Sequence, residues 1–188
     1  MVLEAAAQLF TREGLGTTTN RIAERAGVSI GTVYQYFPNK HALLRALAER
    51  HIVEACRQLD TVFAQLRRED PPFDTAMRAI LDVIVAVHRD RPALHALMHR
   101  LAPRSPADLE ALRAMEEHIT GEVEYHLRRT ERGGDDPALT AQTVFHAVDA
   151  HVHRVLTRHT LDVDHLQDLV QRLLPAPATP EVGRPRDL

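Results

Sequence analysis

The sequence predicts an all-α protein, and three observations support that prediction. Apolar residues recur at helical spacing along nearly the whole chain, whereas the alternation typical of strands is missing. Glycines and prolines separate the periodic segments. The 188 residues are 44% hydrophobic and 26% charged, a globular composition, and no apolar stretch approaches the roughly 20 residues of a membrane helix. We therefore expect helices packed around buried cores, with no membrane partner.

The N-terminal part is predicted to contain three short helices followed by one long helix. Hydroxyl and amide side chains before a periodic segment are natural N-caps, and glycine or proline after one ends a helix. The expected helices run from Val2 to before Gly14, from a cap among Thr17, Thr18 and Thr19 through Arg25, from about Ile30 after Ser29 to Tyr36, and from the Asn39 cap to about Arg68. Gly27 ends the second helix, and Pro38 prevents continuation of the third.

The remaining chain is predicted to form five further helices and a tail. Prolines near the first turns and a glycine pair at Gly133 and Gly134 separate the helices. The expected ranges are Phe73 to His88, Pro92 to Leu101, Pro106 to Arg129, Pro137 to about His159, and Val163 to Leu174. Residues 175–188 are rich in proline and poor in apolar residues, so we expect a mobile tail.

The distribution of charge and the cysteine content indicate which kinds of binding site the chain can and cannot have. Residues 1–50 carry six basic and four acidic side chains, against 17 and 22 in the rest of the chain, although the whole chain has a net charge of only -3. This asymmetry fits a small module that faces an anion, joined to a body that does not. The single cysteine, Cys56, excludes an intrachain disulfide and a cysteine-based zinc site. Without a recognisable signal peptide, we expect a cytoplasmic protein.

Three short helices with a glycine-containing turn between the second and third are typical of a helix-turn-helix, although a purely structural bundle shows the same pattern. The residues are more specific. The segment TTNRIAERAGVSIGTVYQYFPNKHALL, from Thr18 to Leu44, resembles the DNA-binding module of the TetR/AcrR family of bacterial transcriptional regulators. The matching positions are Thr18, Ile22, Ala23, Ala26, Gly27, Val28, Thr32, Tyr34, Phe37, Lys40 and Leu43.

The resemblance implies a function and a domain organisation. Residues 1–47 would form the DNA-binding module, and residues 48–174 a larger helical domain that binds a small molecule and dimerises through its last two long helices. The expected protein is a homodimeric regulator, most simply a repressor, that binds a roughly palindromic double-stranded operator and responds to a small-molecule effector. No cofactor is expected.

Each candidate DNA contact has a physical reason. Small residues at the start of the third helix let its backbone approach the major groove, and Gln35 has the paired donor and acceptor that suit an adenine edge. Lys40, the only lysine, stands in the first helical turn, where a phosphate is favoured. The alternatives are that the threonines only cap, that the tyrosines only pack and that Gln35 is only solvated. The candidates are Thr18, Thr19, Asn20, Ser29, Gly31, Thr32, Tyr34, Gln35, Tyr36 and Lys40.

The candidate ligand site is mainly apolar. His88 shares a helix face with apolar residues, where a hydrogen-bonded core histidine is the alternative, and Asp149 stands at the edge of an apolar stripe, where a solvated carboxylate is the alternative. The expected lining is Phe63, Met77, Ile84, His88, Met98, Met115, Ile119, Phe145 and Asp149.

Two further patterns have more than one interpretation. Val144, Val148, Val152 and Val155 form a stripe, flanked by Phe145 and Leu156, that fits either a dimer interface or the core of the monomer. The twelve histidines include His95 and His99 at i,i+4 and the series His118, Glu122, His126. Neither group matches a zinc signature, so surface or hydrogen-bonded histidines are favoured and no metal site is predicted.

Two other functions are less favoured than that of a DNA-binding regulator. A helical protein-interaction module would not need phosphate-facing residues at the spacing of Thr32, Tyr34 and Lys40. An enzyme would have to use histidines and carboxylates as acid, base or metal ligands. The sequence has no nucleophile elbow, phosphate loop or metal signature that would support such chemistry.

Overall fold

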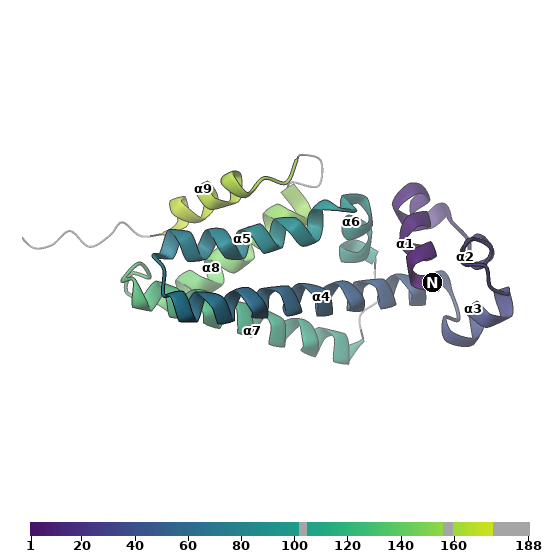
Figure 1. Cartoon of the computed structure of the whole chain (residues 1–188), viewed down its shortest axis with the longest axis horizontal. Helices are drawn as coiled ribbons and strands as arrows, with labels where there is room; N and C mark the ends of the chain where they lie inside the picture. Colours follow the sequence, from purple (N-terminus) through teal and green to yellow (C-terminus); the bar gives the residue numbers. More distant parts are fainter. Residues whose placement is uncertain (102–104, 156–159, 175–188) are drawn as a thin grey trace, which may run out of the picture.

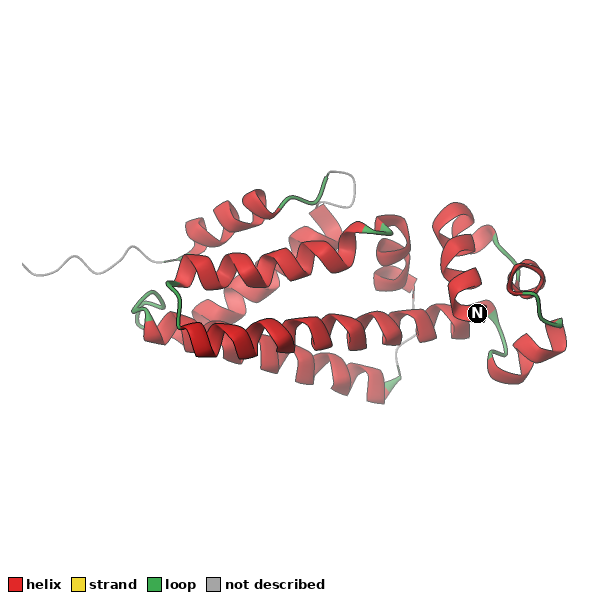
Figure 2. Ribbon diagram, in the orientation of Figure 1, coloured by secondary structure: helices red, strands yellow, loops and turns green. Residues whose placement is uncertain are grey.

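A computed structural model describes residues 1–101, 105–155 and 160–174, and every regular element in these ranges is helical, as Figures 1 and 2 show. The all-α prediction is confirmed. The elements are α1 (Val2–Glu13), the 3-10 turn η1 (Gly14–Gly16), α2 (Thr19–Ala26), α3 (Ile30–Tyr36), α4 (Lys40–Glu69), α5 (Phe73–Arg89), α6 (Pro92–Leu101), α7 (Pro106–Arg129), α8 (Pro137–Ala150), the π-helical segment η2 (His151–Val155) and α9 (Val163–Leu173). Over the described ranges, no helix is both long and apolar enough to cross a bilayer.

The N-terminal helices begin where the capping residues predicted. Thr18 Oγ1 accepts a hydrogen bond from the Arg21 amide at 3.3 Å, and Ser29 Oγ accepts one from the Thr32 amide at 3.0 Å. Asn39 Oδ1 accepts from the Ala42 amide at 2.9 Å at the start of α4. Each cap satisfies a backbone donor that has no partner within its helix.

The buried apolar residues form two separate clusters. The first holds α1, α2, α3 and the beginning of α4 together, and the second lies among α4, α5, α7, α8 and α9. Leu94, Leu97 and Met98 belong to the first cluster, although they lie on α6, which is far from the N-terminal helices in the sequence. In Figure 1, α6 lies beside α1, at the end of the larger domain that faces the N-terminal module.

Helix α4 belongs to both parts of the molecule. It is continuous from Lys40 to Glu69, so the boundary expected between residues 47 and 48 falls inside a helix. Leu43, Leu44 and Leu47 lie in the N-terminal core, while Leu59 and Phe63 lie in the other core. The two parts are therefore joined by an uninterrupted hydrogen-bonded rod and not by a flexible linker.

The helix predicted from Pro137 to about His159 does not run unbroken. α8 ends at Ala150, and the chain continues as the π-helical segment His151–Val155. Apolar periodicity gives no warning of this change, because one inserted residue hardly alters the stripe. Residues 156–159 and the expected tail, residues 175–188, lie outside the described residues.

Candidate DNA-binding face and ligand cavity

Helices α2 and α3 form the helix-turn-helix. Gly27 takes the left-handed conformation at the end of α2, with φ 69° and ψ 29°, which turns the chain toward the second helix. Ile22, Ala23, Ala26 and Val33 are buried between the two helices, and Val28 and Phe37 pack against this core half-buried. The angle between the two helices is therefore fixed by apolar packing.

Several side chains predicted to contact DNA form hydrogen bonds within the module. The side-chain oxygens of Thr18 and Ser29 cap α2 and α3, and the hydroxyls of Ser29 and Thr32 lie 2.8 Å apart. The hydroxyl of Thr19 forms a 3.0 Å hydrogen bond with the Tyr34 hydroxyl, which ties the start of α2 to α3. Capping uses only an acceptor lone pair of a hydroxyl, so its proton is still able to reach a phosphate.

The outer face of α3 is open to solvent. Tyr34 is 50% and Tyr36 70% exposed, so neither ring is simply packed in the core. Asn20, Thr32 and Gln35 are also exposed. Polar and aromatic side chains thus stand together on the face that a helix-turn-helix presents to DNA, and their contacts with DNA remain a prediction.

Gly31 also lies on this open face, in the first turn of α3. Its φ is not positive, and the atom nearest to the position that an added methyl group would take is Ser29 Oγ, at 3.7 Å. Neither backbone strain nor crowding within the protein therefore requires glycine here, even though glycine weakens a helix relative to alanine. The structure thus shows no internal need for the small residue, and its close approach to DNA stays a prediction.

Lys40 lies at the edge of the same face and is half-buried. Its ammonium donates a hydrogen bond to the Leu15 carbonyl at 2.6 Å. A lysine ammonium has three donors, so two stay available beside this bond. A hollow of about 210 Å³ adjoins Lys40 and is lined by Thr17, Thr18, Thr19, Tyr34, Pro38 and Asn39. Its hydroxyls, amide and cation are suited to a phosphate oxygen.

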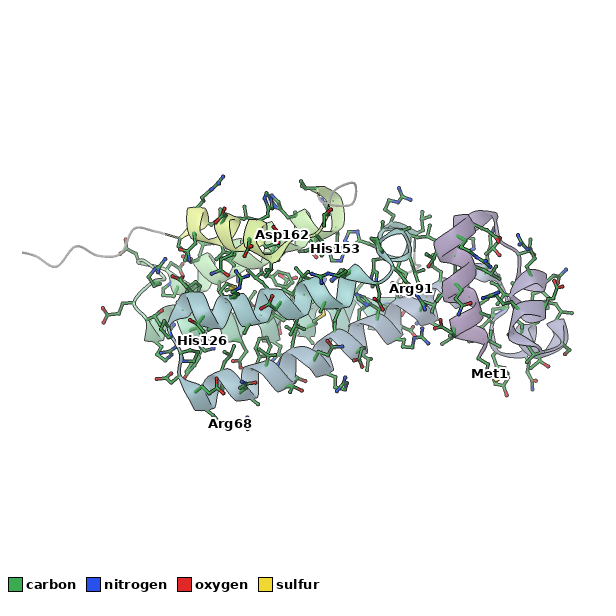
Figure 3. All side chains as sticks on the ribbon, turned by 45° about the horizontal axis from the view of Figure 1, so that its top comes forward. Met1, Arg68, Arg91, His126, His153 and Asp162 are labelled. Atoms are coloured by element: carbon green, nitrogen blue, oxygen red, sulfur yellow. The ribbon has the colours of Figure 1, made fainter. Side chains whose placement is uncertain are left out.

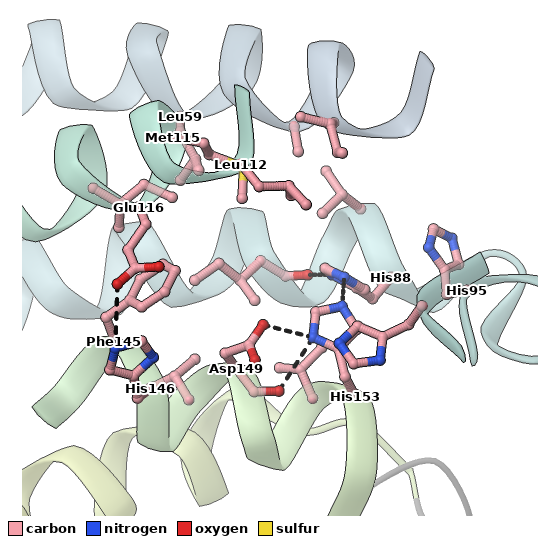
Figure 4. A pocket seen from close by; sticks show the side chains of 18 of the residues that line it. Leu59, His88, His95, Leu112, Met115, Glu116, Phe145, His146, Asp149 and His153 are labelled. Carbon is pink, nitrogen blue, oxygen red and sulfur yellow. Dashed lines mark hydrogen bonds and ion pairs between the residues drawn. The ribbon is translucent and has the colours of Figure 1, made fainter. Parts of the chain in front are cut away.

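The larger domain encloses a cavity of about 1200 Å³ between α4, α5, α6, α7, α8 and η2, part of which is seen in Figure 4. The structure places eight of the nine predicted ligand-site residues in its wall: Met77, Ile84, His88, Met98, Met115, Ile119, Phe145 and Asp149. Phe63 is the exception. It is only 3% exposed and its ring packs on His118, one turn beyond Leu59, the last residue of α4 that lines the cavity.

The valine stripe of the helix from Pro137 faces the interior of the monomer. Val144, Val148 and Val152 are buried in the larger apolar cluster, whereas Val155 is 51% exposed. Of the two flanking residues, Phe145 lines the cavity and Leu156 lies outside the described residues. The core interpretation is therefore correct for the three buried valines and not for Val155, and the dimer contact stays a prediction.

Histidines gather at one end of the cavity, which the sequence did not predict. His51 from α4, His88 from α5, His95 and His99 from α6, and His153 from η2 all line it. Burial first, and the charge of neighbouring histidines to a smaller extent, lower the pKa of His51 and of His88 to about 4 and that of His95 to about 3. These three imidazoles are therefore uncharged at neutral pH.

The surface interpretation is wrong for His95, whose Nδ1 is buried without a hydrogen-bond partner. The i,i+4 spacing of His95 and His99 correctly places both on one face, but only the packing of α6 against α4 and α5 shows that this face points inward. The three residues of the series on α7 have different surroundings. His118 pairs with Asp60 at 2.8 Å, Glu122 pairs with Arg67 at 2.8 Å, and His126 is buried.

Helix α6 contacts both functional regions. Met98 lies in the N-terminal apolar cluster and also lines the cavity, together with His95 and His99. Just before α6, Arg91 forms an ion pair with Glu4 of α1 at 2.6 Å. Figure 3 shows Arg91 near the junction of the larger domain with α1. This part of the cavity wall is therefore in direct contact with the DNA-binding module.

Two family models together match most of the chain. Residues 2–47 match the model of bacterial regulatory proteins of the tetR family, and residues 72–176 match that of the tetracyclin repressor-like C-terminal domain. The second match alone covers more than half of the sequence.

Individual relatives match more locally. The uncharacterized HTH-type transcriptional regulator YvkB of Bacillus subtilis is 45% identical over 51 residues, 27% of each chain. The HTH-type transcriptional repressor KstR of Rhodococcus jostii is 29% identical over 126 residues, 58% of this chain and 59% of KstR. The matched segments thus span less than two thirds of these relatives.

Solved structures match along almost the whole chain. A TetR/AcrR-family regulator from Thermobifida fusca has a TM-score of 0.69 at 20% identity, over 92% of this chain and 93% of the other. FadR of Bacillus subtilis, solved in complex with stearoyl-CoA, has a TM-score of 0.66 at 21% identity, over 92% and 95%. At this identity the likeness concerns the fold. The helix-turn-helix, the larger helical domain and the two matching family models together show that the chain belongs to the TetR family of DNA-binding transcriptional regulators.

Proposed function

We propose that the protein is a homodimeric repressor that a small, mainly apolar ligand releases from its operator. The observation that carries this proposal is the double position of α6, whose Met98 lies in the core of the DNA-binding module and in the cavity wall. A ligand that moves α6 must move its contacts with α1. Family membership supports the DNA-binding role, and we propose no enzymatic activity.

The chemistry of the cavity supports an apolar ligand with one polar end. Isoleucine, leucine, methionine, valine and phenylalanine side chains line most of the wall, while the histidines and Asp149 gather near α6. Such a site buries an apolar body and orients it through few polar groups. KstR, a repressor, and FadR, which was solved with stearoyl-CoA, are similar regulators, and the FadR complex is an example of a large acyl ligand in this fold.

Dimerisation would supply the second recognition helix. One α3 of seven residues contacts few bases, so useful affinity requires two copies on half-sites about 34–36 Å apart. Because Val144 and Val148 face inward, we place the dimer contact on the opposite, exposed stripe of α8, which includes Leu139, Gln142 and Thr143. Leu139 is an apolar residue that is 59% exposed there.

The dimer proposal is tested with two matched substitutions of exposed apolar residues. Leu139→Arg should shift the protein toward monomer in analytical ultracentrifugation and weaken operator binding. Val53→Arg, at a residue 68% exposed on α4, is the control and should change neither. Equal behaviour of both variants, or a footprint without two-fold character, would contradict the proposed interface.

The induction proposal is tested with a ligand found by thermal-shift screening, because a ligand that binds the native state raises its melting temperature. The complex with DNA that flanks the protein's own gene is then titrated with this ligand. Operator affinity should fall, and the operator should weaken ligand binding by the same factor. A tightly bound cavity ligand that leaves operator affinity unchanged would exclude induction by that ligand.

A further inference from the structure

Five histidine side chains form one continuous group beside α6. The ring centroids of His51 and His95 lie 4.2 Å apart, and those of His88 and His153 lie 4.9 Å apart. The His99 ring stacks on that of His153 at 4.4 Å. The group joins α4, α5, α6 and η2, and Asp149 of α8 adjoins it (Figure 4). An apolar ligand alone gives no reason for so many imidazoles in one place.

Hydrogen bonds fix the tautomers of two members. His88 Nδ1 lies 2.7 Å from the Ile84 carbonyl, and His153 Nδ1 lies 2.9 Å from Asp149 Oδ1 and 3.1 Å from the Asp149 carbonyl. A carbonyl only accepts, so each Nδ1 carries the proton and donates it. In the neutral rings, each Nε2 therefore presents a lone pair.

These two Nε2 atoms face each other at 3.1 Å. Two lone pairs at this distance repel unless a proton or a metal ion lies between or beside them. Two imidazole nitrogens bound to one zinc ion at about 2.0–2.1 Å each are themselves about 3–3.5 Å apart. In metal-binding histidines, Nδ1 usually donates a hydrogen bond to a carbonyl or carboxylate, and Nε2 binds the ion.

The neighbouring side chains supply further donors, in two groups of three that meet at His88 and His153. The ligand atoms of His51, His88 and His95 all lie within 4.8 Å of one another, and so do those of His99, Asp149 and His153. His95 Nδ1 is buried without a hydrogen-bond partner, so it has an unused lone pair or proton in the cavity wall. Imidazole is a ligand typical of zinc, copper, nickel and iron, whereas magnesium and calcium prefer oxygen.

We propose that this cluster binds one divalent transition-metal ion of the zinc type, with Nε2 of His88 and of His153 as paired ligands. His51 and His95, which have ligand atoms within 4.8 Å of one of His88, complete the site by turning their rings toward the ion. Asp149 is a positioning residue that holds the His153 ring and adds the nearest negative charge. Because the ligands come from four elements, the ion would fix α6 relative to α4 and α5. The metal-binding proposal does not depend on the proposed repressor function. Any effect of the metal on operator affinity does depend on that function.

The experiment uses the full chain, purified without a histidine tag and freed of metal with a chelator. Co²⁺ is titrated while the visible ligand-field bands are recorded, and Zn²⁺ binding is measured by calorimetry. We expect saturation at one ion per chain and the intense bands of a four-coordinate cobalt site. No saturable binding, or binding only at a level that any exposed histidine provides, would overturn the proposal.

Variants separate this site from the protein's other histidines. His88→Gln and His153→Gln should each weaken Zn²⁺ binding by more than about tenfold, and Asp149→Asn, which leaves all four ligands, by about 10- to 100-fold. His118→Gln is the matched control: that histidine is exposed and pairs with Asp60 on the surface, so Zn²⁺ affinity should stay unchanged. Equal affinities of His88→Gln and His118→Gln would refute the assignment.

Two further measurements keep the result interpretable. Thermal melting of each metal-free variant shows whether it is folded, and if His88→Gln is not, His95→Gln gives the same test from α6. Operator binding is measured separately, with and without Zn²⁺. Saturable binding that the variants abolish supports the metal site whether or not operator affinity changes, so failure of the repressor proposal is not confused with failure of this one.

Discussion

The two halves of the molecule place their polar side chains in opposite ways. In the N-terminal module, Thr32, Gln35 and Tyr36 are exposed to solvent. The core beneath them combines alanines such as Ala6 with large side chains such as Phe10. In the larger domain, histidines and Asp149 face an internal cavity of about 1200 Å³. A tightly filled core keeps an outward-facing surface in one shape, as reading DNA requires. A hollow core leaves space for a ligand and for movement.

The largest expected effect comes from the residues that join the halves. Leu97→Ala, on α6, removes a side chain that is 7% exposed and packs in the N-terminal core. It should lower the free energy of unfolding by about 2–5 kcal/mol and weaken the response of operator affinity to ligand. Leu127→Ala is the control, since Leu127 is buried in the other core and does not line the cavity. Chemical denaturation and operator titration check both, and equal ligand responses would contradict the role of α6.

A second pair of substitutions tests the outward face alone. Gly31→Ala and Gly121→Ala both add a methyl group to an exposed helical position where no atom lies closer than 3.7 Å. Each should stabilise the protein by about 0.5–1 kcal/mol, because alanine favours helix. Only Gly31→Ala should weaken operator binding, by about tenfold or 1.4 kcal/mol, because its methyl group faces the groove. Fluorescence anisotropy would show the contrast, and unaltered binding of Gly31→Ala would remove the reason given for that glycine.

The inward face is tested by conservative changes in the cavity wall. Met115→Leu and Phe145→Leu should each change ligand affinity by about 1 kcal/mol, or roughly fivefold, because the apolar contact area changes. Operator affinity without ligand should be unchanged. Phe63→Leu, in the core but outside the cavity wall, is the control. If this control alters ligand affinity as much as the other two, the cavity is not the ligand site.

The smallest expected effect concerns the single lysine. Lys40→Ala should weaken DNA binding almost equally for all sequences and reduce the magnitude of the salt slope by about 1, as expected for one phosphate contact. Because Lys40 also bonds to the Leu15 carbonyl, the melting temperature is measured beside the binding. A folded variant with the wild-type slope would show that Lys40 serves only the module itself.

Local chemistry and most of the cavity lining were predictable from the sequence, whereas the limits of the cavity were not. Thr18, Ser29 and Asn39 begin helices because a short polar side chain caps the turn that follows it, whatever the rest of the protein does. By contrast, Leu59 lines the cavity while Phe63, one turn on, fills the core. Periodicity gives both the same helix face, and only the positions of the opposing helices separate them.

The histidines show the same limit. The spacing of His95 and His99 fixes their shared face, but their meeting with His51 and His153 depends on how α4, α6 and η2 pack. The π-helical segment adds to the difficulty, since it changes the direction of His153 without a clear signal in the sequence. Contacts between distant segments determine this part of the molecule.

The uninterrupted run of α4 has a mechanical consequence. A helix of 30 residues is about 45 Å long at about 1.5 Å per residue. If it pivots by about 5° at its far end, its first turn, which carries Lys40, swings by about 4 Å, given that length. That swing exceeds the roughly 3.4 Å step between neighbouring base pairs. A tilt too small to disturb side-chain packing around the pivot would thus shift the recognition helix α3 by a full base pair along the DNA.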